Sequence, residues 1–217
     1  MDELQKSSNP RDLATQNCME MAERSHKLGL ELVDYVTGEI EDGWNATEDG
    51  WKYYEDGKKV VGWKAIDGEW YYFDRDGIME TGWVSVDGHW YYLNTDGSME
   101  TGWASIGGYW YYLNADGSME TGWASIGGKW YYLNADGSME TGRASVGGKW
   151  YYLNTDGSME TGWVSVGGKW YHLDNSGAME TGWVSVGGYW YYLNADGSMA
   201  SNQWIDGYYV DASGKMA

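Results

Sequence analysis

The sequence predicts an all-β repeat solenoid of tandem 20-residue β-hairpins, preceded by an N-terminal α-helix. Two observations predict the repeats. The dipeptide "GW" recurs every 20 residues from position 62, with "GR" in its place at 142–143. Each repeat also holds two short β-prone runs separated by a turn dipeptide such as Asp87-Gly88, a pattern typical of hairpins. A fixed period of this length indicates an open array stabilised by contacts between neighbouring repeats.

The chain divides into residues 1–40, an N-terminal helix that acts as a cap or linker, and residues 41–217, an array of about nine hairpin units. Asn9-Pro10 is a helix start, and apolar residues recur at helical spacing between positions 11 and 36. Capping is a need of any open array. We therefore prefer a cap to the alternative, a recognition helix.

The repeat "GWVSVDGHWYYLN" at 82–94 illustrates the expected hairpin. With Asp87-Gly88 as the turn, Trp83 pairs with Tyr92, and Ser85 pairs with Trp90. Side chains alternate across a strand, so one face carries Trp83, Ser85, Trp90 and Tyr92. The other face carries Val84, Val86, Tyr91 and Leu93. The second face holds the aliphatic residues and is expected to be the more buried one.

The amino-acid composition limits the kinds of ligand that the chain is expected to bind. The chain has 16 Trp and 20 Tyr but one Phe, and its formal net charge is −19. Nucleic-acid binding requires Lys and Arg to neutralise phosphates, so this charge argues against it. An acidic surface favours cationic partners, or simply solubility.

Other features exclude several classes of protein. Cys18 is the single cysteine, so no internal disulfide or cysteine-based metal site is expected. No run of about 18 apolar residues predicts a membrane span, and the polar start of the chain does not resemble a signal peptide. No catalytic, metal or cofactor motif stands out, so we expect no enzyme activity, no metal and no cofactor.

Three aromatic residues on one face of each hairpin have two interpretations. They pack between repeats, or they form a receptor for a quaternary ammonium ion, which aromatic ring faces attract. Methionines near the end of each unit, such as Met79, Met99 and Met119, are suited to close such a cage.

The units "TGWVSVDGHWYYLNTDGSME" and "TGWASIGGYWYYLNADGSME" resemble the choline-binding repeats of pneumococcal and related streptococcal surface proteins and of phage lysins. The resemblance covers about residues 43–217. It implies a left-handed superhelix of hairpins that binds choline between consecutive hairpins. Each cage takes two tryptophans from one repeat and an aromatic residue from the next. The resemblance also implies that a homodimer can form through the C-terminal repeats.

Carried onto this chain, each cage combines the "GW" and "WYY" tryptophans of one unit with the second tyrosine of the following unit, which we prefer to the first. The predicted choline-binding sites are Trp44, Trp51 and Tyr72; Trp63, Trp70 and Tyr92; Trp83, Trp90 and Tyr112; Trp103, Trp110 and Tyr132; Trp123, Trp130 and Tyr152; Trp163, Trp170 and Tyr192; and Trp183, Trp190 and Tyr209. In the last unit, Gln203 is assigned to the tryptophan position.

One site is predicted not to bind choline. Arg143 replaces the "GW" tryptophan, Trp150 is the second tryptophan, and His172 occupies the position of the second tyrosine in the next unit. The guanidinium would lie where the ammonium group should be and can stack on Trp150. This unit is expected to hold the array together without binding choline.

The resemblance implies a non-catalytic module that recognises choline on teichoic or lipoteichoic acid at the bacterial cell-wall surface. Such a module would anchor a surface protein, for example an adhesin. Alternatively, it would be the wall-binding part of a lysin whose catalytic domain is absent here. The alternative is a glucan- or carbohydrate-binding repeat of the toxin or glucosyltransferase type. The second tryptophan of each unit argues against that alternative, since the toxin-type repeats usually have "KYYF" there.

Overall fold

The computed structural model describes residues 41–217, and every regular element in this range is a β-strand. The predicted helix and the proposed domain 1–40 lie outside the described residues. Within residues 41–217, no helix has the length and hydrophobicity needed to cross a membrane. The prediction of an all-β array of hairpin repeats is confirmed for this range.

The described residues form two compact units. The first unit, residues 41–102 with 113–119, contains three successive antiparallel sheets, β1-β2-β3, β4-β5 and β6-β7. Their strands are β1 (Gly43–Thr47), β2 (Gly50–Glu55), β3 (Lys58–Lys59), β4 (Gly62–Ile66), β5 (Glu69–Phe73), β6 (Gly82–Val86) and β7 (His89–Leu93).

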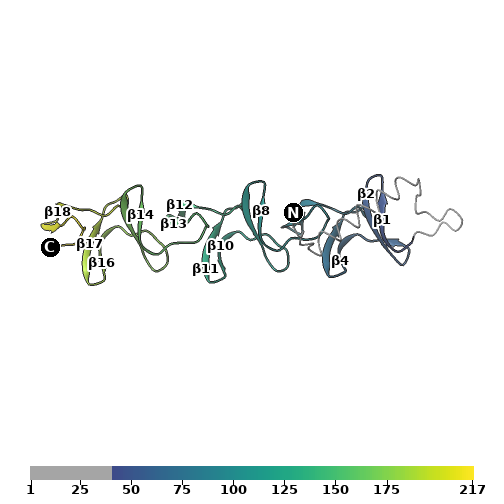
Figure 1. The fold of residues 1–217 in the computed structure, drawn as a ribbon, viewed down its shortest axis with the longest axis horizontal. Coiled ribbons are helices and arrows are strands. Elements are labelled where there is room, and N and C mark those ends of the chain that lie inside the picture. The colour runs from purple at the N-terminus through teal and green to yellow at the C-terminus, as the bar shows by residue number, and fades with distance from the viewer. Residues whose placement is uncertain (1–40) are drawn as a thin grey trace, which may run out of the picture. The chain divides into compact units, whose positions relative to one another are not determined.

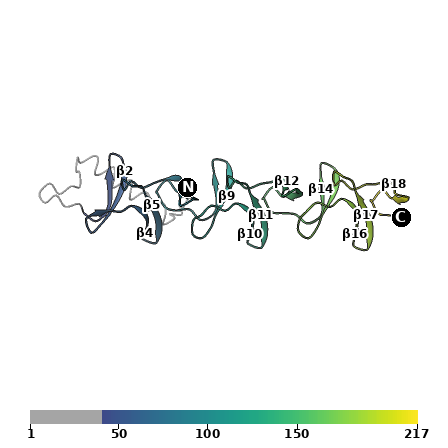
Figure 2. The same cartoon turned by 180° about the vertical axis from the view of Figure 1, so that it is seen from behind.

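The second unit, residues 103–112 with 120–217, contains most of one hairpin and all of five others. Figures 1 and 2 show its successive hairpins projecting in different directions. Its strands are β8 (Gly102–Ile106), β9 (Tyr109–Leu113), β10 (Gly122–Ile126), β11 (Lys129–Leu133), β12 (Gly142–Val146), β13 (Lys149–Leu153), β14 (Gly162–Val166), β15 (Lys169–Leu173), β16 (Gly182–Val186), β17 (Tyr189–Leu193), β18 (Gln203–Ile205) and β19 (Tyr208–Val210).

The strand register agrees with the prediction. In β6-β7, Trp83 lies opposite Tyr92 and Ser85 lies opposite Trp90. Asp87 and Gly88 have φ angles of 50° and 82°. Positive φ at both central residues is typical of a type I′ turn, whose twist matches that of the flanking strands.

The two faces of each hairpin differ in burial as expected. The face with the aliphatic residues, here called the inner face, ends on a fully buried residue in every 20-residue unit. These residues are Phe73, Leu93, Leu113, Leu133, Leu153, Leu173 and Leu193, and Val210 takes the same role in the last hairpin. The opposite face, called the outer face, carries the two tryptophans.

A short loop after each hairpin ties it to the hairpin before. In the loop at 94–99, Asn94 N–H donates to Ser98 O, and Met99 N–H donates to the carbonyl of Trp70 at 2.8 Å. Met79, at the equivalent place one repeat earlier, packs so closely on Gly97 that a Cβ there would lie 2.2 Å from its sulfur. The glycine is therefore required both by this contact and by its φ of +82°.

The last hairpin differs from the prediction. Trp204 lies opposite Tyr209, and Gln203 lies opposite Val210. Trp204 therefore occupies the "GW" tryptophan position, and Gln203 occupies the position of the preceding glycine. Assigning Gln203 to the tryptophan position was wrong, because this hairpin is shortened at its turn and its start is not displaced.

Candidate functional site

In six hairpins the outer face exposes one tryptophan and half-buries the other. The "WYY" tryptophans Trp70, Trp90, Trp110, Trp130, Trp170 and Trp190 are between 46% and 49% exposed. The "GW" tryptophans of the same hairpins are half-buried. Exposure of so large an apolar side chain in repeat after repeat, from Trp70 onward, is not explained by core packing alone.

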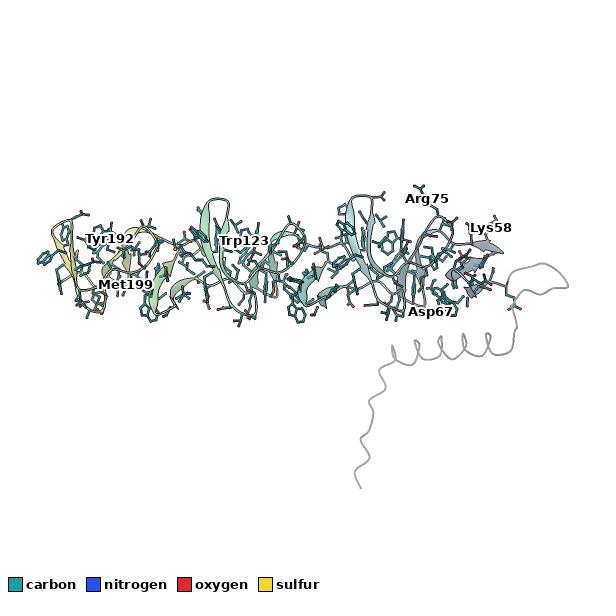
Figure 3. The ribbon with its side chains drawn as sticks, turned by 90° about the horizontal axis from the view of Figure 1, so that it is seen from above. Lys58, Asp67, Arg75, Trp123, Tyr192 and Met199 are labelled. Atoms are coloured by element: carbon teal, nitrogen blue, oxygen red, sulfur yellow. The ribbon has the colours of Figure 1, made fainter. Side chains whose placement is uncertain are left out.

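Six of the "GW" tryptophans lie close to an aromatic ring of their own hairpin and to one of the next hairpin. The Trp63 ring is 5.0 Å from the ring of Tyr72, the second tyrosine of its own hairpin, and 4.8 Å from the ring of Tyr91, the first tyrosine of the next hairpin. Trp123 is likewise 5.1 Å from Tyr132 and 4.7 Å from Tyr151 (Figure 3). All of these ring pairs are edge-to-face, which is a favoured aromatic arrangement.

The predicted third aromatic residue, the second tyrosine of the following hairpin, does not face the "GW" tryptophan in the structure. The first tyrosine of the following hairpin, not the second, faces the "GW" tryptophan, because the outer face of one hairpin meets the inner face of the next. Adjacent residues of a strand point to opposite faces, so the facing residue is the first tyrosine. The second tyrosines, Tyr72, Tyr92, Tyr112, Tyr132 and Tyr192, instead pack on the tryptophan of their own hairpin.

The first tyrosines, which the sequence left as the alternative, are the ones that face the "GW" tryptophans. They are Tyr71, Tyr91, Tyr131, Tyr151 and Tyr191, and Tyr208 takes the same role against Trp183. Tyr209, predicted for the last site, packs on Trp204 instead, and Tyr152 lies on the outer face of its own hairpin opposite Arg143. The site predicted from Trp83 and Trp90 draws on both units and stays a prediction.

A methionine from the following unit lies beside each exposed tryptophan. The N–H of Met199 donates to the carbonyl of Trp170 at 2.7 Å, and Met159 N–H donates to Trp130 O at the same distance. Met199 and Trp163 also pack against the same buried cluster, which contains Tyr191. Two tryptophans, one tyrosine and one methionine thus gather between consecutive hairpins, and they offer ring faces and a polarizable sulfur.

At Arg143, a guanidinium replaces one indole. Its central carbon lies 4.4 Å from the ring centroid of Trp150 and 5.8 Å from that of Tyr171. Nη2 lies 3.7 Å from the Met179 sulfur and donates to the carbonyl of Asp196 at 3.3 Å. The arginine therefore places its own cation among a tryptophan, a tyrosine and a methionine, and Trp150 is only 41% exposed.

His172 does not belong to this group. Its ring lies 4.9 Å from Trp163 of its own hairpin, and Nδ1 lies 2.5 Å from Oε2 of Glu180. The substitutions at Arg143 and His172 therefore affect neighbouring sites, not one shared site. Tyr171 takes the place that the prediction assigned to His172.

The acidic loops remain charged at low pH. Hydrogen bonds from the Ser158 side chain and backbone, then from Lys129, lower the pKa of Asp156 to about 2. Ser198 lowers the pKa of Asp196 to about 2 in the same way, with a smaller effect of Lys169. The carboxylates of Asp156 and Asp196 therefore stay ionised well below neutral pH, and each pairs with a lysine.

The comparisons with known proteins identify the family of the repeats. The choline-binding repeat family matches residues 60–101, 100–140, 120–160 and 160–204. No curated protein matches the sequence. The chain is similar to CbpJ from Streptococcus pneumoniae, with 39% identity over 77% of this chain and 62% of that chain, and a TM-score of 0.76.

Two further solved structures from Streptococcus pneumoniae are similar. Choline binding protein F, solved in the presence of a peptidoglycan analogue, is 40% identical over 77% of this chain and 61% of its own, with a TM-score of 0.74. The modular autolysin LytC, solved in complex with a synthetic peptidoglycan ligand, is 30% identical over 76% of this chain and 41% of its own, with a TM-score of 0.60. The chain thus spans about three fifths of the length of CbpJ and protein F. From its repeats and its hairpin structure together, the chain belongs to the choline-binding repeat family.

Proposed function

We propose that this chain is a non-catalytic module that binds choline on teichoic or lipoteichoic acid and so attaches to the bacterial cell-wall surface. The observation that carries the proposal is the repeated group of one exposed tryptophan, one half-buried tryptophan, a tyrosine and a methionine between consecutive hairpins. A quaternary ammonium ion donates no ordinary hydrogen bond and is attracted to ring faces by about 0.5–2 kcal/mol. Such a ligand suits a site built from rings and sulfur.

The residues proposed to hold choline are those gathered between consecutive hairpins that belong to the same compact unit. They are Trp44, Trp51, Tyr71 and Met79; Trp63, Trp70, Tyr91 and Met99; Trp103, Trp110, Tyr131 and Met139; Trp123, Trp130, Tyr151 and Met159; Trp163, Trp170, Tyr191 and Met199; and Trp183, Trp190, Tyr208 and Met216. The group at Arg143 and Trp150 is proposed to bind no choline, because the guanidinium already occupies the ring faces.

Several weak sites on one chain suit a polymer that carries many cholines. Once one site is occupied, its neighbours bind at a high effective concentration, which raises the overall affinity by about 10²–10⁴. The acidic loops repel the phosphates of the polymer, so the choline headgroup is the group proposed to be recognised.

The superhelix and the homodimer through the C-terminal repeats remain proposals. Exposure of Trp204 (73%) in the last hairpin supports the homodimer, and light scattering tests it.

The experiment is retention on a tertiary-amine resin, followed by elution with choline or with dextran. Choline should release the protein, and dextran should not. Release by dextran alone would favour the glucan-binding alternative. A cell-wall lysis assay on the same protein should show no hydrolysis, as expected of a targeting module.

Individual sites are tested by calorimetric titration with choline. Trp170→Ala removes an exposed wall of one cage and should lower the stoichiometry by one site. Tyr109→Ala is the matched control, because Tyr109 is 63% exposed at a hairpin tip outside the cages. An unchanged stoichiometry in Trp170→Ala, with the fold intact, would contradict the proposed site.

A further inference from the structure

The replacement of a tryptophan by Arg143 leaves an apolar cavity between two hairpins of the second unit. The cavity has a volume of about 70 Å³ and opens to solvent on one side. Its lining comes mainly from the outer face of β12-β13 and the inner face of β14-β15. The lining residues are Arg143, Trp150, Tyr151, Tyr152, Val164, Val166, Tyr171, Leu173 and Met179.

The next repeat shows what this space normally contains. Trp163, at the position equivalent to Arg143, packs against a buried cluster of Val184, Tyr191 and Leu193 from the following repeat, and Val186 and Met199 pack against the same cluster. The residues 20 positions earlier are Val164, Val166, Tyr171, Leu173 and Met179, and all five line the cavity. The cavity is therefore the unfilled place of an indole.

Arg143 lies at the open side of the cavity without filling it. Its side chain is exposed, and its guanidinium stacks on Trp150 and donates to the carbonyl of Asp196 through Nη2. A fixed positive charge at the mouth disfavours cations. The walls are aliphatic and aromatic. The chemistry therefore differs from that of the choline cages, whose walls attract a cation.

We propose that this cavity binds a small planar aromatic molecule, whose ring takes the place of the missing indole. Tyr152 and Tyr171 are placed to contact the ring on two sides, as His172 and Tyr191 contact Trp163 at 4.9 and 4.8 Å. Apolar protein cavities bind such molecules, and an enclosed cavity of about 150 Å³ takes up benzene. The present cavity is smaller but open, so part of the ring remains at the mouth, beneath the guanidinium.

The test uses 5-fluoroindole as the probe and fluorine NMR as the readout, on the full chain. We expect one saturable site in the wild-type chain. Arg143→Trp supplies the indole from the protein itself and should weaken binding at least about tenfold, equivalent to about 1.4 kcal/mol. Arg143→Ala keeps the cavity and should retain the site.

Two controls separate this site from the exposed tryptophans. Saturating choline should not displace the probe, and Trp123→Arg, which repeats the Arg143 arrangement one repeat earlier, should add a second site. Equal binding to Arg143→Trp and wild type would overturn the proposal, as would displacement by choline. Circular dichroism and choline titration establish that each variant is folded. If Trp123→Arg does not fold, the comparison of probe binding between Arg143→Trp and wild type still tests the proposal. The proposal does not depend on choline binding.

Discussion

Replacing Arg143 by tryptophan is expected to stabilise the second unit. The new indole would enter the cavity of about 70 Å³ between β12-β13 and β14-β15. Large-to-small substitutions cost about 24 cal/mol per Å³ of cavity, so filling this one is worth about 1.7 kcal/mol. The substitution also removes the stacking of the guanidinium on Trp150, which is worth about 0.5–1 kcal/mol at an exposed site. The expected net gain is about 1 kcal/mol.

Native-state hydrogen exchange measures this gain locally, which suits an array that need not unfold in a single step. The reporter is the amide of Met179, whose N–H donates to Trp150 O at 2.7 Å across the two hairpins. A gain of about 1 kcal/mol slows its exchange about fivefold. Trp123→Arg is the matched opposite, since it opens an equivalent cavity and should speed exchange at Met159. Unchanged or faster exchange in a folded Arg143→Trp protein would refute the view that the cavity is an unfilled indole position.

Three further predictions concern the fold. Leu133→Ala, at a fully buried inner-face position, should lower the free energy of unfolding by about 2–5 kcal/mol in urea denaturation. Gly117→Ala places a Cβ 2.2 Å from the Met99 sulfur at a φ of +82° and should lower it by at least about 1 kcal/mol; Met99→Ala in the same chain should restore only part of the loss. Because the pKa of Asp156 is lowered to about 2, the stability from its ionised carboxylate is complete above about pH 4 and is lost as pH falls toward 2. As the pH is lowered through that range, the urea midpoint should fall less steeply in Ser158→Ala than in wild type, because this variant lacks the largest cause of the pKa shift. Equal slopes in the two proteins would contradict this.

Much of the hairpin was predictable because its determinants are local. Asp87-Gly88 marks a type I′ turn, the turn sets the register, and the register places Trp83 and Trp90 on one face and Leu93 on the other. The distribution of burial over the two faces follows from the aliphatic residues alone. The stacking of Arg143 on Trp150 was also predictable, since both residues lie on one face of the same hairpin.

The aromatic ring that the next hairpin supplies was not predictable from one hairpin, because it depends on how hairpins stack. The alternation of side chains along a strand places Trp63 and Tyr72 on one face, and that grouping is correct within a hairpin. It does not reveal that the next hairpin presents its opposite face, which brings Tyr91 to Trp63. The cavity beside Arg143 has the same origin, since its far wall belongs to the following repeat.

The bond from each methionine N–H to a tryptophan carbonyl always joins the same two positions of neighbouring repeats, as in Met139 with Trp110 and Met179 with Trp150. If one whole repeat is duplicated or lost, every remaining methionine therefore meets an equivalent tryptophan, and no new surface has to evolve at the junction. Unequal recombination between repeats in the gene can thus lengthen or shorten the array without disturbing its folding. The number of repeats can then change one repeat at a time. A substitution such as Arg143 changes a single position of one repeat.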